Sequence, residues 1–257
     1  MLKINGKIVT DVVYKGKRIE RIYVGSKKYY DMHDGRISGY ALGSGTLSIN
    51  GNTYDYGAGY FDIHVGDTGN VSSFANLFKS ANMSSLSHIG LNTSKVQNMN
   101  SMFLGCWSLT SLDVSRFNTG KVQSMNSMFN GCSSLTSLDV SHFNTGNVQN
   151  MKSMFYGCGN MRTLNIGNMD LSGLTENMSR TFMGCSSLRS ITGQFVGLKL
   201  SISFEWSKLL DHDSAMMVIN SAETVTTVQT VSFSSQTKAL LSDEEKAILT
   251  NKGWTLA

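Results

Sequence analysis

The chain contains no proline, and only 16% of its 257 residues are charged. Without proline there is no proline-rich linker, so we expect the parts of the chain to abut directly. The sequence also lacks an apolar run of about 20 residues, which argues against a transmembrane helix. Its first residues lack the apolar run of roughly 7–15 residues that a secretory signal needs. We therefore expect a protein that is made in the cytoplasm and is not inserted into a membrane.

The charges of the chain give little indication of its binding partners. The formal net charge is +4, and the basic residues are scattered outside one N-terminal stretch, residues 15–28, which predicts no nucleic-acid partner. Polarity comes mainly from Ser, Thr, Asn and Gly, whereas a helical bundle would carry more Glu, Lys and Ala. The composition therefore favours a β-rich or repeat architecture.

A repeat of about 26 residues dominates the middle of the chain. Residues 96–121 read VQNMNSMFLGCWSLTSLDVSRFNTGK, and residues 122–147 read VQSMNSMFNGCSSLTSLDVSHFNTGN. A degenerate copy precedes them from residue 71, and two further copies follow. One cysteine stands at the same place in each of the four later copies: Cys106, Cys132, Cys158 and Cys185. Such a period indicates a stacked repeat architecture.

Each copy has two halves with different periodicity. Apolar residues at i, i+3, i+6 and i+7 within 96–103 predict a short helix, which Gly105 would end. Residues 112–115 alternate apolar and polar side chains, as a strand does, and Asn118 to Gly120 form a turn cluster. One such unit cannot bury its own apolar side, so we expect the copies to stack with their strands in a parallel sheet.

These copies resemble the BspA-like leucine-rich repeats, also called Mycoplasma-lipoprotein-type repeats, with a pattern close to M-x-x-M-F-x-G-C-S-S-L-T-S-L-D-L-S-x-F-N-T. Residues 96–147 match it nearly letter for letter, and 71–95 and 148–200 match it with departures. The resemblance implies an α/β leucine-rich-repeat solenoid with a short helix and a parallel strand in each repeat. It also implies a binding or structural role without enzymatic activity or cofactor, as in bacterial surface adhesins and bacteriophage tail or virion proteins.

The two ends differ from the repeats, so we expect three parts: an all-β module at 1–70, the repeats at 71–200 and a small α+β cap at 201–257. In the first part, Asn50-Gly51 between two strand-like segments predicts a hairpin. Residues 14–30 resemble an opening module of bacteriophage structural proteins, which implies docking to other virion proteins.

The last part carries helix and strand signals. We expect a helix from Asp213 and a strand over 230–234. Ser242 and Glu245 form a capping box for a second helix, which should stop at Gly253 with Lys252 placed against its dipole.

Several residues are of types that can bind a metal or cofactor, but each has a simpler interpretation. One cysteine per copy, without Cys-x-x-Cys spacing, predicts a row of small buried thiols in preference to disulfides or zinc. The methionine column of the repeats predicts core. The stretch of residues 31–34, Asp-Met-His-Asp, is interpreted as a solvated turn in preference to a cation site. We expect no metal and no cofactor.

Polar residues that alternate with buried Leu and Val form the candidate binding face, with a merely solvated surface as the alternative. Arg116 and His142, beside Phe117 and Phe143, stand at its edge, where a partner would be discriminated. The ten candidates are Ser111, Asp113, Ser115, Arg116, Ser137, Asp139, Ser141, His142, Thr163 and Asn165.

These observations lead to one preferred function and two alternatives. The preferred hypothesis is a bacteriophage virion protein, such as a tail, fibre or capsid-decorating component, that presents its repeats to a host glycan or protein and forms a homo-oligomer, with a trimer as our guess. The first alternative is a bacterial cell-surface adhesin. The weaker alternative is a glycan-acting enzyme, which would need paired carboxylates in a cleft.

Overall fold

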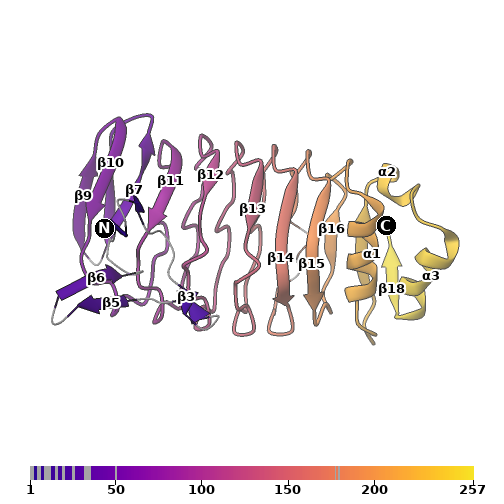
Figure 1. Ribbon diagram of the computed structural model, residues 1–257. Coiled ribbons are helices and arrows are strands. Elements are labelled where there is room, and N and C mark those ends of the chain that lie inside the picture. Colours follow the sequence, from indigo (N-terminus) through magenta and orange to yellow (C-terminus); the bar gives the residue numbers. More distant parts are fainter. Residues whose placement is uncertain are drawn as a thin grey trace.

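The computed structural model describes residues 36–49, 51–176, 178 and 180–257, together with the backbone of six short strands between residues 3 and 31. Figure 1 shows an elongated molecule in which successive stretches of chain stand side by side, from β9 at one end to α3 at the other. The N-terminal short strands are β1 (Lys3–Ile4), β2 (Lys7–Ile8), β3 (Val13–Tyr14), β4 (Lys17–Arg18), β5 (Arg21–Val24) and β6 (Lys27–Asp31). They pair in sequence as three two-stranded antiparallel sheets.

The predicted hairpin is confirmed. Strands β8 (Gly45–Ile49) and β9 (Asn52–Tyr56) pair antiparallel, with Ile49 opposite Asn52. Beside them, β7 (Arg36–Ala41) pairs antiparallel with both β10 (Gly59–His64) and β11 (Met83–Ile89). Strand β11 belongs to the degenerate opening copy and also pairs parallel with the strand of the next copy, so this sheet joins the N-terminal part to the repeats.

The repeats contribute short strands that run in the same direction. They are β12 (Ser111–Leu112), β13 (Ser137–Asp139), β14 (Thr163–Asp170) and β15 (Ser190–Val196). Strand β12 pairs parallel with β11, and β13, β14 and β15 form a separate parallel sheet. The strands of the repeats therefore belong to two small sheets.

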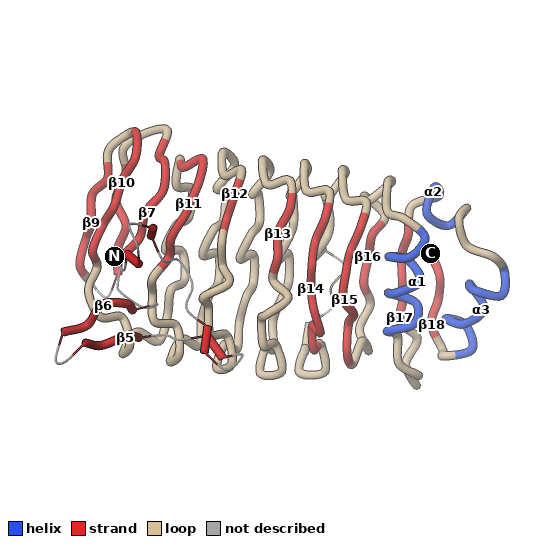
Figure 2. The backbone as a smooth tube through the Cα atoms, viewed as in Figure 1, coloured by secondary structure: helices blue, strands red, loops and turns tan. Residues whose placement is uncertain are grey.

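The expected α/β leucine-rich-repeat solenoid, with a helix in every repeat, is wrong. Within the described residues there are three helices, and all of them lie in the C-terminal part: α1 (His212–Ser221), α2 (Ser235–Lys238) and α3 (Asp243–Asn251). Figure 2 shows the repeats as loops with short strands and no helix. The strands of the repeats are also divided between two small sheets, where we expected one parallel sheet.

The reason lies in where the amides of the expected helix donate. The N–H groups of Met99, Ser101 and Phe103 donate to carbonyls of the following copy at 3.0, 2.8 and 2.8 Å. An α-helix would direct these amides to carbonyls four residues earlier in its own segment. Ser101 also has a positive φ of 55°, which no α-helix accommodates. Stacking therefore satisfies the backbone through the neighbouring copy, and the first half of each copy forms a series of turns.

Seven phenylalanine rings form a row through the interior. Adjacent rings are stacked with centroids 4.5 to 5.9 Å apart, and every ring is buried. The row consists of Phe78, Phe103, Phe129, Phe155, Phe182, Phe204 and Phe233. Its last two members lie beyond the copies that the sequence reveals, so the stacking continues into the C-terminal part.

The thiols form a second buried row, which confirms the prediction of small buried thiols. Each of the four cysteines is free, and each Sγ donates to the carbonyl of a phenylalanine in the preceding copy, at 2.9 to 3.2 Å. Burial raises the pKa of Cys106 and Cys185 to about 12 and raises that of Cys132 and Cys158 as well. The thiols therefore stay protonated and act as packing groups. The methionines of the predicted column are buried too, as expected: Met99, Met102, Met125, Met128, Met151, Met154 and Met178.

Ser207 stands where a further cysteine would continue this row. It follows Phe204 as Cys185 follows Phe182, and both amides donate to the phenylalanine carbonyl three residues earlier. Among the described side chains, the Ser207 Oγ is the buried oxygen or nitrogen atom that has no hydrogen-bond partner. The unpaired Ser207 hydroxyl therefore lowers the stability of the buried row at this position.

We expect Ser207→Cys to raise the free energy of unfolding by about 1 kcal/mol, because a thiol tolerates an apolar site better than an unpaired hydroxyl. The matched control is Cys185→Ser, which should lower it. Urea unfolding followed by circular dichroism measures both changes. A Ser207→Cys protein that is less stable than the wild type would contradict the account.

The C-terminal part follows the predicted signals closely. Helix α1 begins one residue before Asp213, the Ser242–Glu245 capping box opens α3, and β17 (Gln229–Phe233) is the expected strand. It pairs parallel with β16 (Ile202–Phe204) and β18 (Trp254–Leu256). Lys252 is the residue at which α3 ends, but its charge does not lie against the α3 dipole as expected: its Nζ donates to the carbonyls of Ile219 and Asn220 at the end of α1.

Candidate binding face

The outward residues of β12, β13, β14 and β15 form one surface, which we call the strand face. Ser137 lies opposite Thr163, and Thr163 lies opposite Ser190, on adjoining parallel strands. All ten candidates from the sequence are described: seven are exposed, and Arg116, Ser141 and Asn165 are half-buried. Within the described part of the chain, the hydroxyls of Ser111, Ser137 and Thr163 have no recorded intramolecular partner, so they are available to a ligand.

The two aspartates have a structural task at the end of their strands. Asp113 Oδ1 accepts a hydrogen bond from the Ser115 amide, and Asp139 Oδ1 accepts one from the Ser141 amide, both at 2.9 Å. Hydrogen bonds from the Ser141 side chain and amide lower the pKa of Asp139. The Asn165 side chain donates a further bond to Asp139 Oδ2 at 3.2 Å. Both carboxylates therefore close turns, and Asp139 stays ionised at neutral pH.

The two phenylalanines that we expected at the edge of the face do not lie on its surface. Phe117 and Phe143 are buried, so they support the face from below and do not reach a partner. The exposed His142 ring reaches back to the preceding copy, with Nε2 2.7 Å from the Val114 carbonyl. Of the edge residues, Arg116 and His142 remain candidates for contact with a ligand.

The sequence alone did not reveal that the face extends in both directions. Towards the N-terminus, Tyr40 lies opposite both Tyr60 and Ser85, and the two tyrosines are 50% and 71% exposed. Towards the C-terminus, Arg162 and Arg189 precede Thr163 and Ser190, and both are exposed. The arginines stand where Thr110 and Thr136 stand in the earlier copies, so an alignment of the copies with one another would have identified them.

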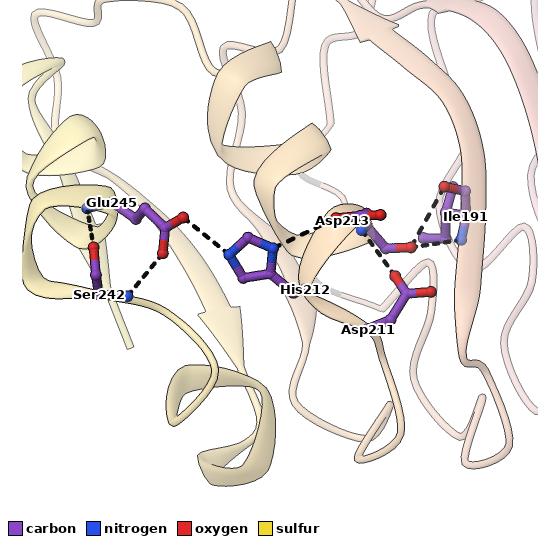
Figure 3. A network of polar contacts seen from close by, with 7 residues as sticks. Ile191, Asp211, His212, Asp213, Ser242 and Glu245 are labelled. Atoms are coloured by element: carbon purple, nitrogen blue, oxygen red, sulfur yellow. Dashed lines mark hydrogen bonds and ion pairs between the residues drawn. The ribbon is translucent and has the colours of Figure 1, made fainter.

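A separate polar network joins two helices of the C-terminal part (Figure 3). His212 Nε2 lies 2.9 Å from Glu245 Oε1, and its Nδ1 lies 3.5 Å from Asp213 Oδ1. Hydrogen bonds that the His212 ring donates to the carboxylates of Glu245 and Asp213 raise its pKa. Ser242 uses its Oγ to accept the Glu245 amide. Because both ring nitrogens face carboxylates, this network joins α1 to α3 and does not form a nucleophile and base pair.

Metal-binding side chains do not cluster in the described residues. Among them, no group of three or more His, Cys, Asp and Glu side chains is arranged to hold a metal ion. The stretch at residues 31–34, apart from the backbone of Asp31, lies outside the described residues, as do the side chains of the proposed docking segment at 14–30. In the described part of the chain, no helix has the length and apolar character to span a membrane.

Comparison with known proteins concerns the repeats. Residues 72–195, just under half of the chain, match a family model described as "Mycoplasma protein of unknown function, DUF285". The searches of curated proteins and of solved structures found no match. The matched segment covers the copies with the Met, Phe, Gly and Cys spacing and ends within β15. The match supports the assignment of these repeats to the Mycoplasma-lipoprotein-type, BspA-like repeat family.

Proposed function

We propose that the chain is a non-enzymatic structural and binding protein that displays the strand face to an extended ligand, a glycan or a protein. The observation that carries the proposal is the row of hydroxyls on Ser111, Ser137 and Thr163, which bond to no described residue and recur at the spacing of the copies. Rows of stacked rings and thiols hold the copies in register beneath it. Such a surface is preorganised, so little conformational entropy is lost when a ligand binds.

The carboxylates of the face favour this function over the glycan-acting enzyme. A glycoside hydrolase needs one carboxyl group as an acid and a second as a nucleophile or base. Asp113 and Asp139 instead accept amide hydrogen bonds at strand ends, and Asp139 has a lowered pKa, which is unsuited to a general acid.

The setting that we propose is a bacteriophage virion, in which the N-terminal module docks to other virion proteins and the chain forms a homo-oligomer, with a trimer as the specific hypothesis. A bacterial cell-surface adhesin is the alternative. Mass spectrometry of purified particles should find the chain at a fixed copy number. Its detection only on the bacterial surface would favour the adhesin.

A variant pair tests the binding face itself. We expect the triple variant Ser111→Lys, Ser137→Lys and Thr163→Lys to lose binding to intact bacteria and to immobilised polysaccharides, because three long side chains would cover the hydroxyl row. The matched control places lysine at Gln97, Gln123 and Gln149, which are exposed in the other half of the same copies. Equal binding by the two variants, or no binding by the wild type to bacteria, glycans or proteins, would reject the proposed function.

A further inference from the structure

Two exposed arginines, Arg162 and Arg189, lie at the border of the strand face, one residue before β14 and one before β15. The Arg189 amide donates to the Arg162 carbonyl at 2.9 Å, and the residues that follow them, Ser190 and Thr163, are register partners. The two arginines therefore stand side by side immediately before β14 and β15, adjoining parallel strands that lie about 4.8 Å apart.

The described part of the chain offers these arginines no counter-ion. Neither guanidinium takes part in a recorded hydrogen bond or ion pair with a described residue. The acidic residue next in this row is Asp211, whose amide donates to the Arg189 carbonyl. Its carboxylate is directed to the start of α1, where Oδ1 accepts the Ser214 amide at 2.9 Å (Figure 3). Like charges side by side on a sheet are destabilising, so folding alone does not account for this pair.

The surroundings of the arginines indicate the kind of anion. Hydroxyls of Ser137, Thr163 and Ser190 lie beside them on successive strands, followed on β15 by the exposed side chains of Thr192 and Gln194. A protein partner would require apolar or aromatic anchors at the centre of its interface, and single-stranded nucleic acid would require aromatic stacking platforms. The residues around the two arginines are mainly polar and provide neither, and the exposed tyrosines of the face, Tyr40 and Tyr60, lie at its other end. The polar residues do match a polymer that carries hydroxyl groups along its length and an acidic group at intervals.

We infer that the strand face binds an acidic polysaccharide, with the paired guanidinium groups of Arg162 and Arg189 holding its carboxylate or sulfate groups and the neighbouring hydroxyls binding the sugar hydroxyls. Arginine suits this task because its planar fork forms two parallel hydrogen bonds with a carboxylate or sulfate. The inference rests on the proposed function and names its ligand class. Because the site is an open surface, binding weakens as the salt concentration rises.

Binding of the purified chain to immobilised polygalacturonate, dextran sulfate and neutral dextran tests the inference. We expect the wild type to bind at least one acidic polymer at least ten-fold more tightly than neutral dextran. The double variant Arg162→Gln and Arg189→Gln should lose this preference, whereas Lys79→Gln with Lys121→Gln, which removes two charges from exposed positions outside the strand face, should retain it. Arg162→Lys with Arg189→Lys keeps the charge but loses the bidentate bonds, so it should bind with intermediate strength.

The outcomes distinguish a failure of the inferred ligand class from a failure of the proposed binding function. If the double glutamine variant binds the acidic polymers as the wild type does, or if the wild type binds neutral dextran equally well, the inference is rejected while the proposed binding function stands. If the wild type binds bacteria or a protein but none of the polymers, the inference is likewise rejected alone. If the wild type binds no polysaccharide, protein or bacterial surface, both are rejected.

Discussion

Replacing Phe129 by Ala is expected to lower the free energy of unfolding by about 3–5 kcal/mol, the usual range for removing a buried aromatic side chain. The ring is fully buried and stacks on Phe103 at 5.5 Å and on Phe155 at 5.8 Å. Each copy in such a row is stabilised by its neighbours, so a cavity between two copies weakens both contacts. Urea unfolding monitored by circular dichroism measures the change.

Trp107→Ala is the control for this prediction. Trp107 belongs to the copy before Phe129, but its side chain is 53% exposed. Its removal leaves no cavity in the interior, so we expect a change below about 1 kcal/mol. A Phe129→Ala protein as stable as the Trp107→Ala protein would show that the row of rings does not hold the copies together.

Replacing Gly167 by Ala is expected to lower the free energy of unfolding by about 2–5 kcal/mol, from backbone strain and steric overlap together. Gly167 has a φ of 57°, and a Cβ atom there would lie 2.3 Å from the Ser141 carbonyl oxygen. It also lies at the register shift in the pairing of β14 with β15. The backbone of the preceding copy therefore leaves no room for a side chain.

Gly51→Ala separates the two contributions. Gly51 has a φ of 80°, but nothing lies within 4 Å of the position that its Cβ would occupy. Only the strain of the left-handed conformation applies there, about 1–2 kcal/mol. Thermal unfolding of both variants measures the difference, and a Gly167→Ala protein no less stable than Gly51→Ala would disprove the steric argument.

In the repeats, local sequence patterns predicted which side chains are buried but did not predict the backbone conformation. The spacing of Met, Phe and Cys identified which side chains are buried, because burial follows from the apolar pattern in either a helix or a stack of turns. It did not identify the backbone conformation of the first half. The same i, i+3 spacing that predicts a helical face also arises when every second amide from Met99 to Phe103 donates to the next copy.

The candidate face was predicted in part. Alternation in 111–115 and 137–141 placed Ser111, Asp113, Ser137 and Asp139 on the outside, where the structure has them. Alternation carries no information on hydrogen bonds, so the turn-closing role of the two aspartates was not anticipated. The pairing of Arg162 with Arg189 was missed because the step of 27 residues between them becomes a contact only once the copies are stacked.

By itself, the sequence determined the period, the buried rows, the hairpin at Gly51 and the capped helix that starts after Ser242, because each depends on neighbouring residues. The tertiary structure alone decided that the copies contain turns where helices were expected, that the ring row continues to Phe204 and Phe233, and that the two arginines lie together. The physical reason is the same in all three cases. A backbone amide or an apolar ring bonds or packs where a partner is available, and here that partner belongs to a copy about 26 residues away.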